Sequence, residues 1–181
     1  MKRTLCALLL FLAACSSAPA PAPPAASSPP AARTTTAAAP VWPAPADAAA
    51  AAGEAGLVLL DAEGQVLHIH AHLDVFVNGA LVSVPAEIGI DVAAQRISPL
   101  HTHDDSGVIH VESPVMRDFT LGQFFAEWRQ SLRGSAVYVG GAPYSGDPAA
   151  LVLRAHQEIA VVYGQLPAGG VPKDYSFAEG L

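Results

Sequence analysis

The chain has 181 residues, with 9 Lys and Arg against 16 Asp and Glu, which gives a net charge of −7 when histidine is neutral. This acidic balance and the lack of any basic patch argue against a nucleic acid as partner. The length suits one compact domain with a core of its own, preceded by segments of very different composition.

The first fifteen residues have the layout of a secretory signal peptide. Lys2 and Arg3 form a short basic region, and Leu5–Ala14 is an apolar run too short to remain as a membrane-spanning helix. The sequence Leu-Ala-Ala-Cys that ends at Cys15 resembles the processing box of bacterial lipoproteins. This resemblance implies cleavage before Cys15 and a lipidated, palmitate-bearing Cys15. An ordinary signal peptide is the alternative.

The lipoprotein resemblance also predicts a location. Ser16 follows Cys15 and no Asp stands beside it, which favours anchoring at the outer membrane or cell surface. The membrane is therefore an expected partner, reached through the lipid on Cys15. We expect the domain to face the periplasm or the exterior.

The cysteine count limits the chemistry of the exported part. Cys6 lies inside the leader and Cys15 is the predicted anchor, and the chain has no other cysteine. The domain that follows therefore has no disulfide and no thiolate ligand. Met116 is its single methionine, which argues against a soft Cu(I) site. Any metal must be held by imidazole and carboxylate groups.

Residues 16–53 have the composition of a tether. They contain nine of the sixteen prolines, and Ala, Ser and Thr make up most of the rest. Such a segment buries too little apolar surface to offset the cost of ordering, so we expect it to be disordered or polyproline-like, with weak helical tendency at residues 46–52. We place a single His-rich globular domain at residues 54–181.

Val66–Val77 alternates strictly between two classes of residue, which predicts a strand. The polar face carries His68, His70, His72, Asp74 and Phe76, and apolar residues form the other face. Asn78-Gly79 predicts a two-residue hairpin turn after this strand. Because His68 and His72 would lie roughly 13 Å apart, only two neighbouring histidines of the strand can bind the same ion.

Pro99–Glu112, with the sequence PLHTHDDSGVIHVE, predicts a second antiparallel hairpin. Asp104-Asp105-Ser106-Gly107 has typical turn chemistry. A two-residue or four-residue loop would place His101 opposite His110 and point His101, His103, His110 and Glu112 the same way. A three-residue loop would turn His110 to the opposite face.

The remaining segments predict a helix and further strands. Phe119–Gly134 has an apolar stripe at helical spacing, with Thr120 and Gln123 as a capping box and Gly134 as the expected end. Short strands are expected at residues 136–139 and 158–163. The fold class predicted is α+β, a small and mostly antiparallel sheet of hairpins covered by one amphipathic helix.

Four stretches carry a resemblance over about residues 57–181. They read HIHAHLDVFVNG, PLHTHDDSGVIHVESP, FTLGQFFAEW and YSFAEGL. Together they resemble a family of exported or membrane-anchored bacterial proteins of uncharacterised function. The resemblance implies that these residues form one domain, and it implies no particular activity.

The histidine pattern predicts a site for a divalent transition metal. Imidazole suits Zn, Cu(II), Ni and Fe, and we expect zinc or copper. The expected ligands are His101, His103 and His110, followed by His70 and His72 as further ligands or a second site. The carboxylates expected to orient the imidazoles are Asp104, Glu112 and Asp74. The role of His156 stays open between a ligand and a surface turn residue.

Three functions remain open at this point. The first is capture, buffering or delivery of the metal. The second is a metal-dependent hydrolase or hydratase, in which three His ligands and a bound water act with Glu112 or Asp104 as general base. The third is a non-metal binding or adhesion module with a His-lined polar face. Four or more His ligands would favour binding, and three ligands plus water in a pocket would favour catalysis.

Overall fold

The computed structural model describes residues 39–181. The predicted signal peptide, Cys15 and most of the predicted tether lie outside this part of the chain. Within residues 39–181, no helix combines the length and the hydropathy needed to cross a bilayer.

The helices are α1 (Ala48–Glu54), α2 (Leu121–Glu127) and the 3-10 turn η1 (Pro148–Ala150). The strands are β1 (Leu67–Val77), β2 (Ala80–Val82), β3 (Ile90–Asp91), β4 (Arg96–Ile97), β5 (Leu100–His101), β6 (Val108–Ser113), β7 (Ser135–Val139), β8 (Ala142–Pro143) and β9 (Glu158–Tyr163).

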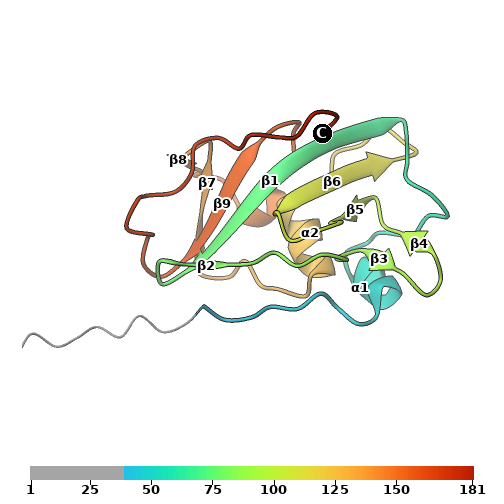
Figure 1. Cartoon of the computed structure of the whole chain (residues 1–181), viewed down its shortest axis with the longest axis horizontal. Helices are drawn as coiled ribbons and strands as arrows, with labels where there is room; N and C mark the ends of the chain where they lie inside the picture. Colours follow the sequence, from blue (N-terminus) through green and yellow to red (C-terminus); the bar gives the residue numbers. More distant parts are fainter. Residues whose placement is uncertain (1–38) are drawn as a thin grey trace, which may run out of the picture. The chain divides into compact units, whose positions relative to one another are not determined.

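One sheet organises the domain. Its strands follow the order β5-β6-β1-β9-β7-β8, with β2 paired to β1, and β3 and β4 form a separate two-stranded sheet (Figure 1). All of these pairings are antiparallel except that of β1 with β9, which is parallel. The α+β class with a mostly antiparallel sheet is confirmed, with a second short helix in addition to the one expected.

Strand β1 separates two kinds of surface, as its alternation predicts. Leu73 and Val75 are fully buried in the main core, together with aromatic residues of α2. On the opposite face, Phe76 forms a smaller apolar cluster with Ala160 and Val162 of β9. The Asn78-Gly79 turn closes the predicted hairpin, which pairs Val77 with Ala80 and Val75 with Val82. The histidines of β1 therefore lie on the face away from the helices.

The second hairpin has the register that brings its histidines together. His101 of β5 pairs with His110 of β6, and Leu100 pairs with Val111. Leu100 and Val111 are buried in the main core. Because directly opposed residues share a face, His101 and His110 lie together on the other side of the sheet. The prediction made for a two-residue or four-residue loop is confirmed.

Helix α2 begins as predicted and ends early. The Thr120 side chain accepts a hydrogen bond from the Gln123 backbone, and Gln123 returns one to Thr120, which confirms the capping box. The helix ends at Glu127, and Gly134 is not its terminus. Arg129 takes a positive φ of 59° and closes the end with bonds from its own N–H to Ala126 and from the next N–H to Phe125.

Residues 39–53, which we assigned to a disordered tether, are part of this fold. Asp47 caps α1, in which Ala51 and Ala52 are fully buried and Ala52 belongs to the main core. Trp42 packs edge-on against Trp128, the residue that follows α2, with ring centroids 5.7 Å apart. Composition misled the prediction because alanine, which is common in disordered tethers, is also small enough to let α1 pack closely against the core, and Trp42 adds an aromatic contact to it.

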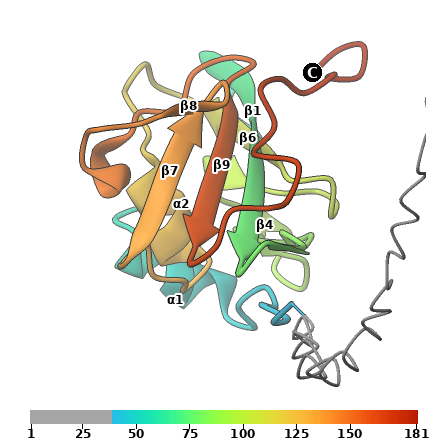
Figure 2. The same cartoon turned by 90° about the vertical axis from the view of Figure 1, so that its left-hand side faces the viewer.

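The C-terminal segment crosses the histidine-bearing face of the sheet (Figure 2). The Tyr175 ring stacks on His72 of β1, with centroids 3.7 Å apart. Phe177 stacks on His156, whose Nε2 lies 2.9 Å from the backbone oxygen of Leu181. His156 is thus an exposed turn residue with a positive φ, and the structure gives it no part in the histidine cluster.

Glu127 is an unusual residue for the core. Its side chain is fully buried at the end of α2, and neither carboxylate oxygen has a hydrogen-bond partner among the described residues. Burial raises the pKa of the Glu127 carboxyl to about 8, and the nearby Ser98 side chain has the smaller, opposite effect. The folded protein therefore holds a proton on Glu127 that the unfolded chain, with a pKa near 4.5, has already released at neutral pH.

The Glu127→Gln variant is expected to remove a pH-dependent loss of stability. Between pH 4.5 and about 8 the folded state binds more protons at this position, so the wild-type free energy of unfolding falls as pH rises. The free energy of unfolding should fall by up to about 1.4 kcal/mol per pH unit in this range. The wild type should therefore lose a few kcal/mol of stability that the variant keeps. Urea unfolding of metal-free protein at several pH values measures this. The exposed Glu179→Gln is the matched control, and equal pH profiles for Glu127→Gln and wild type would contradict the prediction.

Candidate metal centre

Three neighbouring strands place a row of histidines across the polar face of the sheet. His110 on β6 pairs with His101 of β5 on one side and with His70 of β1 on the other. The next row pairs Glu112 of β6 with His68 of β1. His103 lies two residues beyond His101, just past the end of β5. The two strands of the hairpin and strand β1 thus form one patch, which consists of His68, His70, His101, His103, His110 and Glu112.

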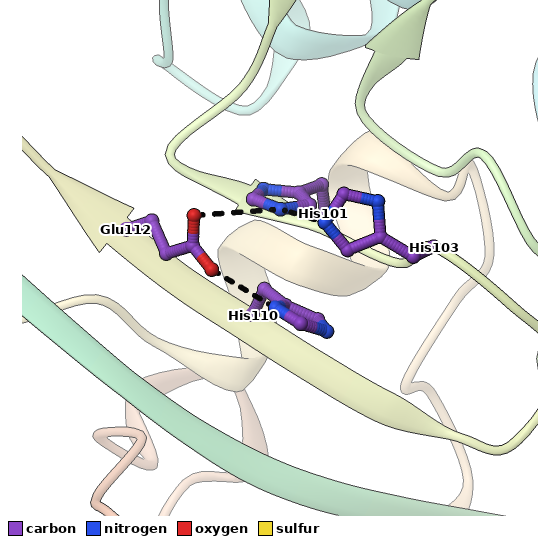
Figure 3. A group of neighbouring side chains, drawn as sticks. All are labelled: His101, His103, His110 and Glu112. Carbon is purple, nitrogen blue, oxygen red and sulfur yellow. Dashed lines mark hydrogen bonds and ion pairs between the residues drawn. The ribbon is translucent and has the colours of Figure 1, made fainter. Parts of the chain in front are cut away.

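The Glu112 carboxylate faces His101 and His110 (Figure 3), and it also lies close to His68 and His70. It is only 2 % exposed. Its Oε1 lies 2.9 Å from His110 Nδ1, 3.5 Å from His68 Nε2 and 3.6 Å from His70 Nε2. Its Oε2 lies 3.9 Å from His101 Nε2. One buried carboxylate therefore faces four imidazoles from three chain segments.

The first group of possible ligands consists of His101, His103, His110 and Glu112, which offer ligand atoms within 4.8 Å of one another. The Nε2 atoms of His101 and His103 are 3.1 Å apart. Two nitrogens bound to one tetrahedral zinc at about 2.0–2.1 Å would be roughly 3.3 Å apart. The rings are thus already spaced as ligands of a single ion would be.

The backbone sets the tautomer of His101. Its Nδ1–H donates to the Ser98 carbonyl, at 2.9 Å, so Nε2 carries the lone pair and points at the group. This is the arrangement by which proteins orient metal-binding histidines. His101 is fully buried, whereas the His103 side chain is 43 % exposed and lies at the solvent edge.

A second group consists of His68, His70 and Glu112, again with ligand atoms within 4.8 Å of one another. His70 is buried, and its Nε2 has no hydrogen-bond partner among the described residues. The His68 side chain is 40 % exposed and gives this group its own access to solvent. Two pairs of neighbouring histidines on β1 were candidates to bind one ion, His68 with His70 and His70 with His72. In the structure, His68 and His70 lie in the same group.

The electrostatics of the patch favour neutral imidazoles around an anion. Burial lowers the pKa of His101 to about 4. Burial also lowers the pKa of His70, and the neighbouring His110 and His68 add to this effect. Burial alone would raise the pKa of Glu112, but its hydrogen bond to His110 and the surrounding imidazoles bring that pKa down to about 2. Neutral imidazoles and an ionised carboxylate are the forms that bind metal ions.

His72 does not join this patch. It belongs to a third group, with Asp74 and Glu158, which lies further along β1 than His70. Its Nδ1 lies 2.7 Å from Glu158 and its Nε2 lies 2.9 Å from the Ser106 carbonyl, so both ring nitrogens are engaged. Burial opposes protonation, but the Glu158 hydrogen bond and charge raise the pKa of His72 overall. A metal ion in this third group would have to replace one of these two contacts of the His72 ring.

The three predicted orienting carboxylates have different outcomes. Glu112 contacts His110 Nδ1 as an orienting carboxylate would. Asp104 instead accepts a hydrogen bond from the Ser106 backbone in its own turn and makes none to a histidine within residues 39–181. Asp74 lies with His72 and Glu158, away from the main patch. Asp104 is therefore a turn-forming residue in this structure.

Sequence reasoning missed two acidic residues next to histidines. Glu63, in the loop before β1, lies 3.4 Å from His103 Nε2 and could act as a further ligand at the solvent edge. Glu158 on β9 binds His72 because β9 pairs in parallel with β1. Glu63 stands five residues before His68 and Glu158 stands two residues after His156, so no local pattern links either one to the histidine that it contacts.

No family model, curated protein or solved structure matches this chain. The chemistry therefore rests on the geometry alone. Buried His and Glu side chains from β1, β5 and β6 form groups that could hold a metal ion.

Proposed function

We propose that this protein is an envelope lipoprotein whose domain binds a divalent transition metal for capture, buffering or delivery. The convergence of five imidazoles on the buried carboxylate of Glu112 carries this proposal. The metal would be zinc or copper, since the donors are imidazole and carboxylate and the domain has no cysteine. The Leu-Ala-Ala-Cys box that ends at Cys15 supports lipid anchoring.

Two unpartnered atoms support a metal in this patch. His70 Nε2 and Glu112 Oε2 are buried without a hydrogen-bond partner among the described residues. Leaving a buried polar group unpaired costs about 1–3 kcal/mol, and more when it is charged. Bound metal would give these atoms partners and would neutralise the carboxylate.

The number of donors supports binding more than catalysis. A catalytic zinc typically has three protein ligands and an open position for water. Here five histidines and Glu112 surround the patch, which is enough to close the coordination of an ion. The exposed edges at His68 and His103 would let the ion enter and leave, as capture and delivery require.

Zinc affinity of the untagged full chain tests the proposal. Competition with a chromophoric chelator should show tight zinc binding by wild type and a loss of at least about tenfold for His101→Ala and for His103→Ala. His103 is half exposed, so its replacement leaves the core intact even if the buried His101 variant folds poorly. His156→Asn is the matched control, since Asn tolerates the positive φ at that exposed turn. Wild-type affinity retained by both variants, or no zinc binding by wild type, would overturn the proposal.

A further inference from the structure

The patch offers more donors than one ion can use. Five imidazoles and one carboxylate gather in it, whereas a zinc ion in a protein usually takes four ligands. We propose that the patch is a two-ion centre in which Glu112 bridges two metal ions. This inference rests on the metal-binding function proposed above and adds the number of ions and how they are linked.

The donors divide into two groups by distance. One group holds His101, His103 and His110, and the other holds His68 and His70. Glu112 is the single residue that belongs to both, because its ligand atoms lie within 4.8 Å of those of either group. Two binding positions with one shared carboxylate follow directly from this arrangement.

The two oxygens of Glu112 point in different directions. Oε1 faces His68 and His70, at 3.5 and 3.6 Å, and also lies 2.9 Å from His110 Nδ1, while Oε2 faces His101, at 3.9 Å. The separations from His68, His70 and His101 are too long for ordinary hydrogen bonds and are close to the spacing of two ligands on one ion. Because Oε1 faces His68 and His70 while Oε2 faces His101, this carboxylate can bridge ions about 3.5–4 Å apart, as in known two-metal sites.

Each position has its own unpartnered atom. His70 Nε2 lies in the His68 group, and Glu112 Oε2 faces the His101 group. A single ion in either group would leave the other atom buried and unsatisfied. Two ions would satisfy both, and the exposed side chains of His68 and His103 give each position its own route to solvent.

Zinc stoichiometry tests the two-ion centre. The untagged full chain is dialysed to equilibrium against micromolar zinc, and the bound metal is measured by elemental mass spectrometry. Wild type should hold two zinc ions per chain, and His68→Ala should hold one. His103→Ala should also hold one, and the double variant should hold none. His156→Asn is the control and should hold two. Both altered histidines are partly exposed, so the variants should fold normally.

The outcomes separate this inference from the proposed function. One zinc in wild type that is unaffected by His68→Ala would overturn the two-ion centre and leave metal binding in place. Two zinc ions in both wild type and His68→Ala would also overturn it, and would direct attention to the group of His72, Asp74 and Glu158. No zinc in wild type would overturn both.

A measurement on wild type alone gives an independent check. Cobalt(II) is titrated into the metal-free chain and followed by electron paramagnetic resonance. The first equivalent should give a signal, and the second should reduce the signal per ion because a carboxylate bridge couples neighbouring ions magnetically. A signal that doubles with the second equivalent would place the ions apart and contradict the bridge.

Discussion

Replacing Glu112 with glutamine is expected to weaken zinc binding by about a hundredfold or more. Glutamine keeps the size of the side chain but removes the negative charge on which the imidazoles converge. Loss of an orienting partner alone typically costs 10–100-fold in metal affinity, and Glu112 is placed to act as a ligand as well. Chelator competition measures the affinity, and circular dichroism checks the fold.

The matched control for Glu112 is Glu158. It is also a buried glutamate on a central strand with a histidine partner, since it hydrogen-bonds His72. It lies in the separate third group, so Glu158→Gln should leave zinc affinity at the main patch unchanged. Equal losses of zinc affinity in the two variants would show that the effect comes from general destabilisation.

Zinc is expected to raise the thermal stability of the protein substantially. A ligand that binds only the folded state adds about 4 kcal/mol at a thousand times its dissociation constant. For a domain of this size that corresponds to a rise of roughly 10 °C in the midpoint of unfolding. The rise should reverse with a chelator, and it should fade below about pH 5 because protons compete with the metal for imidazole. Calorimetry with and without zinc measures the shift.

His103→Ala is the informative variant for the thermal experiment. Its side chain is 43 % exposed, so the metal-free variant should unfold close to the wild-type temperature. Its zinc-induced shift should be clearly smaller than that of wild type, because one ligand of the first group is lost. A full shift in this variant would mean that zinc stabilises the protein from another site.

The local patterns of the sequence predicted the elements well where a short-range rule applies. The alternation in residues 66–77 and the Asn78-Gly79 turn predicted a long strand and a hairpin whose register the structure confirms. The capping box of Thr120 and Gln123 marked the start of α2. These features depend on residues a few positions apart, so they can be recognised without the tertiary structure.

The ends of elements and the limits of the domain were predicted less well. Helix α2 stops at Glu127, shortly before Arg129, which adopts a left-handed conformation and pairs its side chain with Glu54 of α1, at 2.8 Å. Trp42 packs against Trp128, eighty-six positions later in the chain. Both effects come from contacts between distant segments, which propensity and composition do not reveal.

The sequence by itself determined which residue types could hold a metal and on which face of each strand they stand, because side chains alternate with a period of two. Only the tertiary structure decided which of them meet. The pairing of β1 with β6 sets His70 beside His110 and brings Glu112 to the centre, while the parallel pairing of β1 with β9 gives His72 to Glu158. The physical reason is that the choice of neighbouring strands is made by burial of the apolar face, and the polar face follows from it.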